Sequence, residues 1–549
     1  MTKRSLALAF SVLFCVLGAC SAPAPAPDTA TQLDTWIADL ADDAMEGRGP
    51  GTAGDVMARQ YIADVMAGMG LEPAAADGSW EQPFDIVGID AAVPETWTFE
   101  SSGGDSVEFA FWDEFIAHSG VQSDQAAIEN AEIVFVGYGI QAPEYGWDDY
   151  GDADLAGKVL VMLNNDPDWD PDLFEGDRRL YYGRWTYKYE SAAAQGAVGA
   201  IIIHTTPSAG YPFQVVQTSW TGPQFELPAE GEARTQINAW LTEEASRRLF
   251  ALAGVDYDET LESARSADFA PVPLGLSTSL SLTNTVTSEQ TANVLGALPG
   301  SDPALADEWI VFTAHHDHLG ISPDESLEDR IYNGALDNAA GVAQVLAVAG
   351  KLAAQEPGPS RSMLFALVGA EEQGLLGSEY YAAHPTVPPG KMAANINYDG
   401  GNQWGRTRDV TYIGYGKSSL DAVVEAAAAE QGRTVLPDQF PDRGFFYRSD
   451  QLNFARIGVP AIYLDNGTDF IDRPEGWGHE QLEAWTANIY HQVSDEYGPD
   501  WNLEGMVDDV ELGLACARAI SENPELPAWN PGDEFEAARL AALAAVAGD

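Results

Sequence analysis

Hydrophobic and polar positions follow three patterns along the chain, and the first is helical. From residue 31 to residue 71, apolar side chains recur every three or four positions in two successive stripes. The first stripe consists of Leu33, Ile37 and Leu40, and the second of Val56, Ile62, Val65 and Met66. Residues at this spacing share one face of a helix, so the region predicts two amphipathic helices.

The second pattern is a set of short apolar runs in the middle of the chain. Residues 133–139, 157–163 and 199–204 are typical of buried strands, and residues 187–195 favour a helix beside them. Residues 80–128 predict short strands and loops. This middle part contains no cluster of metal ligands and no nucleophile beside a base, so it is interpreted as an inserted module that shapes access to a site elsewhere.

The third pattern begins near residue 280, where strands and helices alternate to the end of the chain. Strands are predicted at residues 309–314, 363–368, 393–398 and 459–464, with helices at residues 342–352 and 534–547. This alternation is typical of an α/β fold. The length of 549 residues exceeds what one hydrophobic core normally serves, so two domains and a processed leader are expected.

Polar residues with metal-binding side chains lie in the loops that follow these strands. The candidate ligands are His315, Asp337, Glu372, Asp399 and His491. In an open α/β sheet, sites form at the carboxyl ends of the strands. Two histidines and three carboxylates suit zinc, and a carboxylate can bridge two ions. The adjacent Glu371 and Glu372 can point at different targets, one at a metal and the other at a water molecule.

Other sequence signatures are poorly matched or missing. Residues 49–54 match a dinucleotide-binding glycine pattern, but that pattern needs a preceding strand, and here a helix is predicted instead. A turn between two helices explains these glycines better. The chain has no His-Glu-x-x-His pair and no Gly-x-Ser-x-Gly turn, which disfavours single-zinc proteases and serine hydrolases.

Charge narrows the range of partners. The chain carries 85 Asp and Glu against 27 Lys and Arg, a net charge of -58. Such a negative field repels nucleic acid and anionic membrane surfaces, so neither is expected as a partner. The excess is interpreted mainly as a solvated acidic surface.

The N-terminus predicts export. Lys3 and Arg4 precede an apolar run over residues 6–17, which is too short for a stable membrane span, and small residues then lead to Cys20. This order resembles a bacterial lipoprotein signal with Cys20 lipidated, and ordinary cleavage nearby is the alternative. The lipid on Cys20 would be the only membrane attachment, in the periplasm or at the outer membrane. Cys516 would be the one internal thiol, which excludes an intrachain disulfide.

Five segments together resemble the co-catalytic zinc exopeptidase family, peptidase family M28, which includes secreted bacterial aminopeptidases and glutamate carboxypeptidases. They are residues 315–320, 333–341, 370–378, 395–400 and 490–497. Residues from about 133 to 270 are similar to the protease-associated (PA) domain that some of these peptidases carry. The resemblance implies a mixed, mainly parallel sheet sandwiched by helices, with a small inserted PA-like domain.

The resemblance also implies a division of the chain. The expected parts are a lipoprotein signal peptide (residues 1–19), an Ala/Pro tether (20–30), an N-terminal part of the peptidase domain (31–130), a PA-like insert (131–270) and the catalytic domain (271–549).

The same resemblance implies roles for the candidate site residues. His315 and Asp399 would bind one zinc ion, Glu372 and His491 the other, and Asp337 would bridge the two. Glu371 would be the general base, and Asp317 would orient the His315 imidazole.

Four further positions near these residues carry weaker expectations. A tyrosine before the last ligand, here Tyr490, would hydrogen-bond the oxyanion or serve only in packing. His316 and His318 receive no role. Close relatives have a histidine where this chain has Gln451, which puts inferred substrate contacts in doubt.

The leading hypothesis is a zinc aminopeptidase that removes N-terminal residues from peptides through a metal-bridging hydroxide. Three alternatives stay open. One is a di-zinc carboxypeptidase or dipeptidase, another a zinc acyltransferase that cyclises N-terminal glutamine, and the third an inactive surface lipoprotein that binds peptides.

Overall fold

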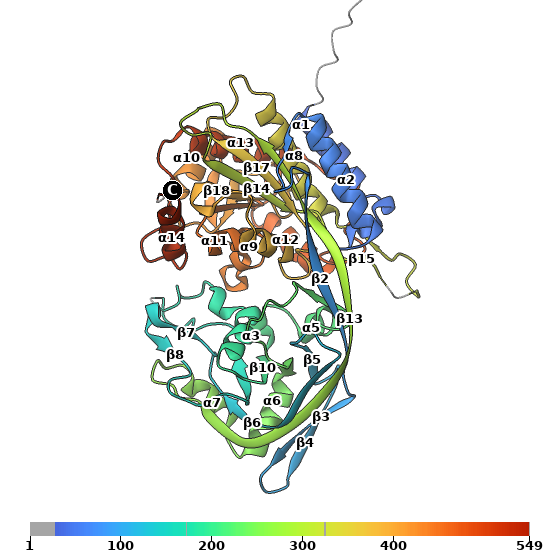
Figure 1. Ribbon diagram of the computed structural model, residues 1–549, viewed down its shortest axis with the longest axis vertical. Helices are drawn as coiled ribbons and strands as arrows, with labels where there is room; N and C mark the ends of the chain where they lie inside the picture. The colour runs from blue at the N-terminus through green and yellow to red at the C-terminus, as the bar shows by residue number, and fades with distance from the viewer. Residues whose placement is uncertain (1–27, 172, 323–324, 548–549) are drawn as a thin grey trace, which may run out of the picture.

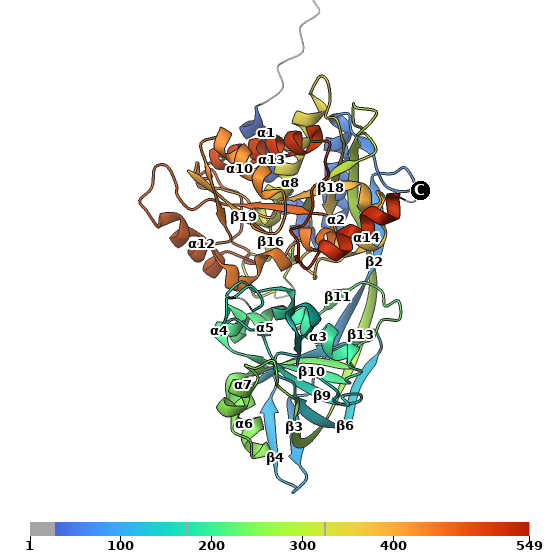
Figure 2. The same ribbon diagram turned by 90° about the vertical axis from the view of Figure 1, so that its left-hand side faces the viewer.

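The computed structural model describes residues 28–171, 173–322 and 325–547. The expected signal peptide, Cys20 and most of the expected tether lie outside these residues. Figures 1 and 2 show two bodies, an upper one that contains both described ends of the chain and a lower one built from the middle. Two long strands connect them, β2 (Glu81–Ala92) and β13 (Val272–Leu298).

The upper body is built on a mixed sheet whose centre is parallel. In order across the sheet its strands are β13, β17 (Ser362–Val368), β14 (Trp309–His315), β18 (Met392–Asn397), β21 (Ala461–Asp465), β19 (Asp409–Ile413) and β20 (Thr434–Pro437). The four strands from β17 to β21 run parallel to one another. The predicted mixed, mainly parallel sheet is therefore confirmed.

Helices cover both faces of this sheet. One face carries α1 (Thr29–Leu40), α2 (Ala53–Gly68), α8 (Ala340–Ala353), α10 (Asp421–Glu430) and α13 (Glu504–Glu522). The other carries α9 (Leu376–Ala383) and α11 (Gln451–Arg456). Side chains alternate along β14, so Ile310 and Phe312 pack in the first layer and Val311 in the second.

The glycine-rich segment before α2 is a turn, as predicted. A 3-10 helix (Asp43–Arg48) precedes it, and the Thr52 side chain caps α2 by accepting a hydrogen bond from the Asp55 backbone N–H. A capped helix start without a preceding strand excludes the dinucleotide-binding geometry.

The lower body has its own parallel sheet. Its strands in order are β6 (Gln125–Phe135), β9 (Val159–Leu163), β10 (Gly199–His204), β12 (Ile237–Thr242) and the antiparallel β5 (Phe115–Ser119). The hairpin of β3 (Thr96–Ser101) and β4 (Ser106–Ala110) and the helices α3 (Trp185–Ala194), α6 (Glu243–Ala253) and α7 (Tyr257–Ser263) complete it. The predicted strands at 157–163 and 199–204 and the predicted helix at 187–195 are confirmed, whereas β6 begins earlier than expected.

Strand pairing does not follow the expected boundary at residue 131, because that position lies inside β6. β13 pairs with β6 up to Thr283 and with β2 from Thr283 onwards, so this strand passes from one body to the other at that residue. Boundaries between the two bodies near residues 93 and 283 agree better with the strand pairing. That the insert is a PA-like domain stays a prediction.

The remaining elements are short or peripheral. They are β1 (Glu72–Pro73), β7 (Gln141–Ala142), β8 (Trp147–Asp148), β11 (Gln224–Glu226), β15 (Gly320–Ile321), β16 (Ile331–Tyr332), α4 (Thr206–Ala209), α5 (Phe213–Ser219), α12 (Trp477–Asn488) and α14 (Glu536–Ala547). Among the described helices, none has the length and apolar character needed to cross a membrane. Cys516 is a buried free thiol.

One of the contacts between the two bodies joins a loop of each. The Arg179 backbone N–H donates to the Pro441 carbonyl over 3.0 Å, and the Tyr181 and Tyr447 rings lie 6.3 Å apart. The segment 178–184 of the lower body therefore packs against the segment 441–448 of the upper body.

Candidate metal centre

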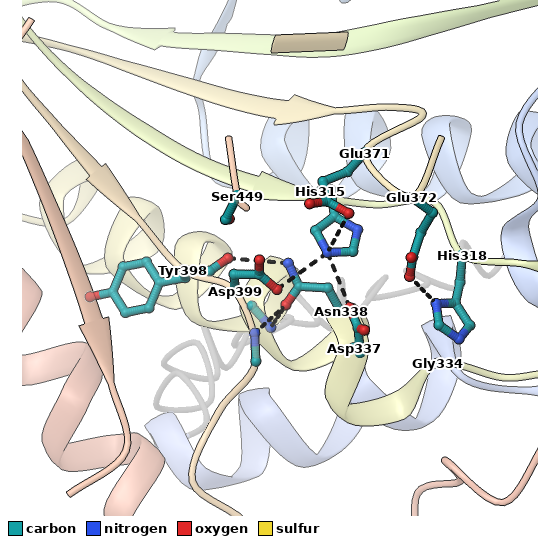
Figure 3. A network of polar contacts seen from close by, with 12 residues as sticks. His315, His318, Gly334, Asp337, Asn338, Glu371, Glu372, Tyr398, Asp399 and Ser449 are labelled. Carbon is teal, nitrogen blue, oxygen red and sulfur yellow. Dashed lines mark hydrogen bonds and ion pairs between the residues drawn. The ribbon is translucent and has the colours of Figure 1, made fainter. Parts of the chain in front are cut away.

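Three loops at the carboxyl ends of the parallel strands bring His315, Asp337 and Asp399 together. His315 is the last residue of β14, and Asp399 follows β18 by two residues. The His315 Nε2 atom lies 3.2 Å from Asp337 Oδ1 and 3.3 Å from Asp399 Oδ1, as Figure 3 shows. Neighbouring parallel strands end at one sheet edge, which is why residues 84 positions apart meet here.

A second group shares the same aspartate. His491 Nε2 lies 3.3 Å from Asp337 Oδ2 and 3.0 Å from Glu372 Oε2. Asp337 thus presents one carboxylate oxygen to each histidine. One histidine on each side of a single carboxylate is the arrangement that a bridging ligand of two ions requires.

Glu371 faces the first group. Its Oε2 lies 3.8 Å from His315 Nε2, and its side chain is 10% exposed. His315, Glu371 and Asp399 form one group whose ligand atoms lie within 4.8 Å of one another, and His315, Asp337 and Glu372 form another. The structure therefore brings together all six residues expected to carry the chemistry.

The carboxylates around the centre shift the pKa values of the histidines. Burial alone lowers the pKa of His315, but Glu371, Asp337 and Asp399 outweigh it and raise that pKa well above its usual value. Burial alone raises the pKa of Asp337, yet His315 and His491 pull it well below its usual range. The site holds excess negative charge that cations would balance.

The donor atoms fit zinc. The Nε2 atom of His491 is buried and has no hydrogen-bond partner among the described residues, although two carboxylates lie within 3.3 Å of it. A buried imidazole nitrogen that lies beside carboxylates and makes no hydrogen bond is explained if it is a metal ligand. Imidazole and carboxylate are ordinary zinc ligands, so the residues present suit two zinc ions.

Asp317 was expected to orient the His315 imidazole, but its side chain supports the site in another way. Its carboxylate accepts hydrogen bonds from the backbone N–H groups of Glu371 (3.0 Å) and Glu372 (3.3 Å). The His315 Nδ1 atom lies 3.2 Å from the Asp317 backbone carbonyl and 3.8 Å from its carboxylate. The Asp317 carboxylate thus fixes the turn carrying both glutamates, and its carbonyl orients the imidazole.

Sequence reasoning missed two residues that hold Asp337 and Asp399 in place. The Asp495 carboxylate accepts hydrogen bonds from the backbone N–H groups of Leu336 and Asp337. The Asn338 side chain accepts from the Gly400 N–H and donates to the Tyr398 carbonyl. Asp495 is separated from Asp337 by 158 positions, so the only available signal was an acid four residues after His491.

The two remaining histidines of the first loop have separate surroundings. His318 Nδ1 lies 2.5 Å from Glu372 Oε1, so it holds that carboxylate toward His491, a contact that sequence reasoning did not foresee (Figure 3). His316 points away, with Nε2 beside the Ala292 carbonyl, and burial lowers its pKa to about 4.

The less closely matched positions also lie near the site. The Tyr490 ring stacks on the His491 ring with centroids 3.8 Å apart. Gln451 is fully buried; it accepts from Asn397 Nδ2 and donates to the Phe446 carbonyl. Gln451 is therefore satisfied within the fold, and it ties β18 to the loop that carries Arg448.

Arg48 connects the two ligand loops from behind. It is 1% exposed, and its guanidinium donates to the carbonyls of Leu40, His316, Asn333 and Gly334 over 2.6–2.9 Å. His316 follows the first ligand, and Gly334 precedes the loop of Asp337. One side chain therefore fixes both loops to the N-terminal helices.

Replacing Arg48 with Met is expected to lower the free energy of unfolding by about 3 kcal/mol or more, because four buried carbonyls lose their donor. Denaturant unfolding measures this loss. The matched variant Arg518→Met, at an exposed position on α13, is expected to change stability by no more than about 0.5 kcal/mol. Equal stability of the two variants would contradict this role of Arg48.

Fold and site together define the class of structure, an α/β fold with a candidate metal centre at the carboxyl ends of its parallel strands. Residues 293–514, which contain the whole candidate centre, match the family model described as Peptidase family M28. This part of the chain is therefore similar to the M28 peptidases.

Comparison with individual proteins gives further likenesses. The aminopeptidase from Aneurinibacillus sp. strain AM-1 has a TM-score of 0.52 and 18% identity, over 92% of this chain and 96% of that one. At this identity the likeness shows the fold alone. It extends over both bodies of the structure.

Two curated proteins align with part of the sequence. Leupeptin-inactivating enzyme 1 of Streptomyces exfoliatus is 25% identical over 252 residues, 44% of this chain and 51% of that protein. Probable lipoprotein aminopeptidase LpqL of Mycobacterium tuberculosis is 30% identical over 180 residues, 30% of this chain and 35% of that protein. The chain spans about half or less of the length of these relatives.

Proposed function

We propose that the protein is a zinc-dependent exopeptidase, and specifically an aminopeptidase that removes N-terminal residues from peptides. The observation that carries the proposal is Asp337, whose two carboxylate oxygens face His315 and His491 at 3.2 and 3.3 Å. The M28 match over residues 293–514 supports the same reaction class.

In this proposal the chain binds two zinc ions. His315 and Asp399 would hold one ion, Glu372 and His491 the other, and Asp337 would help to hold both. When bound, the ions would polarise the scissile carbonyl and activate a water molecule. His318 and Asp495 keep Glu372 and Asp337 aimed at the centre.

Glu371 carries the proton in this proposal. It takes a proton from the attacking water and delivers it to the leaving amine. Its carboxylate lies near His315 but, unlike that of Asp337, is not shared with a second histidine. Asp317 fixes the backbone of Glu371 and so keeps this carboxylate in place. Tyr490, stacked on His491, would donate a hydrogen bond from its hydroxyl group to the developing oxyanion.

The free amino group of the substrate would dock against the carboxylates at the open side of the centre. Asp399 is 19% exposed there, whereas Glu372 is 3% exposed. A cationic terminus also suits a chain with a net charge of -58. The relatives named as aminopeptidases are consistent with this polarity.

Leucine p-nitroanilide tests the proposal directly. The purified protein is expected to hydrolyse it, to lose the activity with 1,10-phenanthroline and to regain it with zinc. N-acetylleucine p-nitroanilide is the matched control, because it lacks the free amine and is expected to resist cleavage. Hydrolysis of the acetylated substrate alone would refute an aminopeptidase, and activity unaffected by the chelator would refute the metal centre.

The expected location extends the proposal. The N-terminal pattern of basic, apolar and small residues before Cys20 supports an exported lipoprotein attached only through a lipid on that cysteine. One curated relative carries the word lipoprotein in its name. Peptides in the periplasm or outside the cell would then be the substrates.

A further inference from the structure

His318 is a buried histidine of the first ligand loop that belongs to neither group of candidate ligands. Its Nδ1 atom lies 2.5 Å from Oε1 of Glu372, a contact that Figure 3 shows, and its side chain is fully buried. The other oxygen of the same carboxylate, Oε2, lies 3.0 Å from His491 Nε2. The two histidines therefore contact different oxygens of Glu372.

Packing holds the His318 ring in this orientation. Gly334 lies against it so closely that a Cβ atom at that position would come within 2.6 Å of the ring atoms Cγ and Cδ2. The His491 ring lies 5.7 Å away and the Tyr332 ring 6.5 Å away, both turned steeply against it. A side chain held in this way keeps one rotamer, so its Nδ1 atom stays directed at Glu372.

The direction of the hydrogen bond follows from the ligand role of Glu372. An ionised carboxylate only accepts hydrogen bonds, so His318 donates from Nδ1 to Oε1. The second ring nitrogen, Nε2, is buried and meets no hydrogen-bond partner within the described residues. Among these residues, Glu372 is therefore the one hydrogen-bond partner of the His318 ring.

The hydrogen bond leaves Glu372 a single oxygen for a cation. Because Oε1 is taken by His318, Oε2 alone faces His491 and the rest of the centre. A carboxylate whose two oxygens are both free can bind a cation through one or both of them. Partners that hold a ligating carboxylate restrict this freedom, and their removal typically lowers metal affinity by about 10- to 100-fold.

We propose that His318 is a positioning residue that commits Glu372 to the second zinc ion through Oε2 and so sets the affinity of that ion. This role rests on the proposed function, because it concerns the loading of the same centre. In the described part of the structure, His318 makes no hydrogen bond to His315 or Asp399. Removal of the His318 side chain would therefore weaken the second ion selectively.

Zinc titration of His318→Ala tests this role. The variant is expected to bind the second zinc ion about 10- to 100-fold more weakly than the wild type, while the affinity of the first ion changes by less than about threefold. Competition of the zinc-loaded protein with chelators of graded affinity measures both dissociation constants. His318→Asn is expected to recover most of the loss, because its Nδ2–H group donates from nearly the position of Nδ1.

His316→Ala is the matched control, because it removes an equally buried imidazole from the same loop. The His316 Nε2 atom lies beside the Ala292 carbonyl, so this variant is expected to keep both dissociation constants even if its melting temperature falls. An unchanged second dissociation constant in His318→Ala, or an equal loss in His316→Ala, would overturn the role of His318. Equal losses in His318→Ala and His318→Asn would make His318 a ligand instead, which would also overturn it.

The zinc content of the wild type separates failure of this role from failure of the proposed function. If the wild-type protein binds fewer than two zinc ions, the proposed metal centre fails, and the role of His318 fails with it. If the wild type binds two ions and hydrolyses leucine p-nitroanilide, whereas His318→Ala binds both ions as tightly, only the role of His318 fails. Because zinc binding is measured without a peptide, the result does not depend on which end of a peptide is cleaved.

Discussion

Replacing Glu371 with Gln is expected to reduce kcat by about 100- to 10,000-fold while leaving two zinc ions bound. The amide keeps the shape of the side chain but cannot take a proton from water. Both histidines, Asp337, Asp399 and Glu372 remain in place, so the metal content should not fall. Turnover of leucine p-nitroanilide and zinc per protein, measured on the same sample, check the two halves of this expectation.

Glu379→Gln is the matched control for this variant. Glu379 lies eight positions later, on α9, where its side chain is exposed and belongs to neither group of candidate ligands. It is expected to retain wild-type turnover. If Glu371→Gln were as active as this control, Glu371 would not be the base; if it lost zinc as well, it would have to be reassigned as a ligand.

Strand ends made the ligand set predictable from the sequence. His315, Glu372 and Asp399 each follow an apolar run within a few residues, and parallel strands deliver such positions to one sheet edge. The alternation of strands and helices after residue 280 was an equally local signal. The resemblance added the roles of these residues, which the geometry now makes testable.

Contacts between distant segments were beyond sequence reasoning. Arg48 binds carbonyls that lie 268 and 286 positions later, and no local pattern marks an arginine for such a place. β13 also went unrecognised as a 27-residue strand, although its apolar residues alternate between Leu274 and Leu282. Its two ends pair in different bodies, so no single sheet would have explained its length.

Replacing Asp337 with Asn is expected to abolish turnover and to remove both zinc ions. The aspartate faces His315 with one oxygen and His491 with the other, so loss of its charge weakens both sites together. His491→Ala is expected to be less severe, because His315 and Asp399 keep their contact at 3.3 Å. Zinc per protein should fall from two to zero in the first variant and to one in the second.

His479→Ala serves as the control for both variants. This histidine lies on α12, where its ring contacts Phe440 at 5.1 Å and no ligand of the centre. It is expected to retain two ions and full activity. The decisive comparison is between Asp337→Asn and His491→Ala: if each lost a single ion, the two sites would be independent, and Asp337 would be an ordinary ligand of one ion.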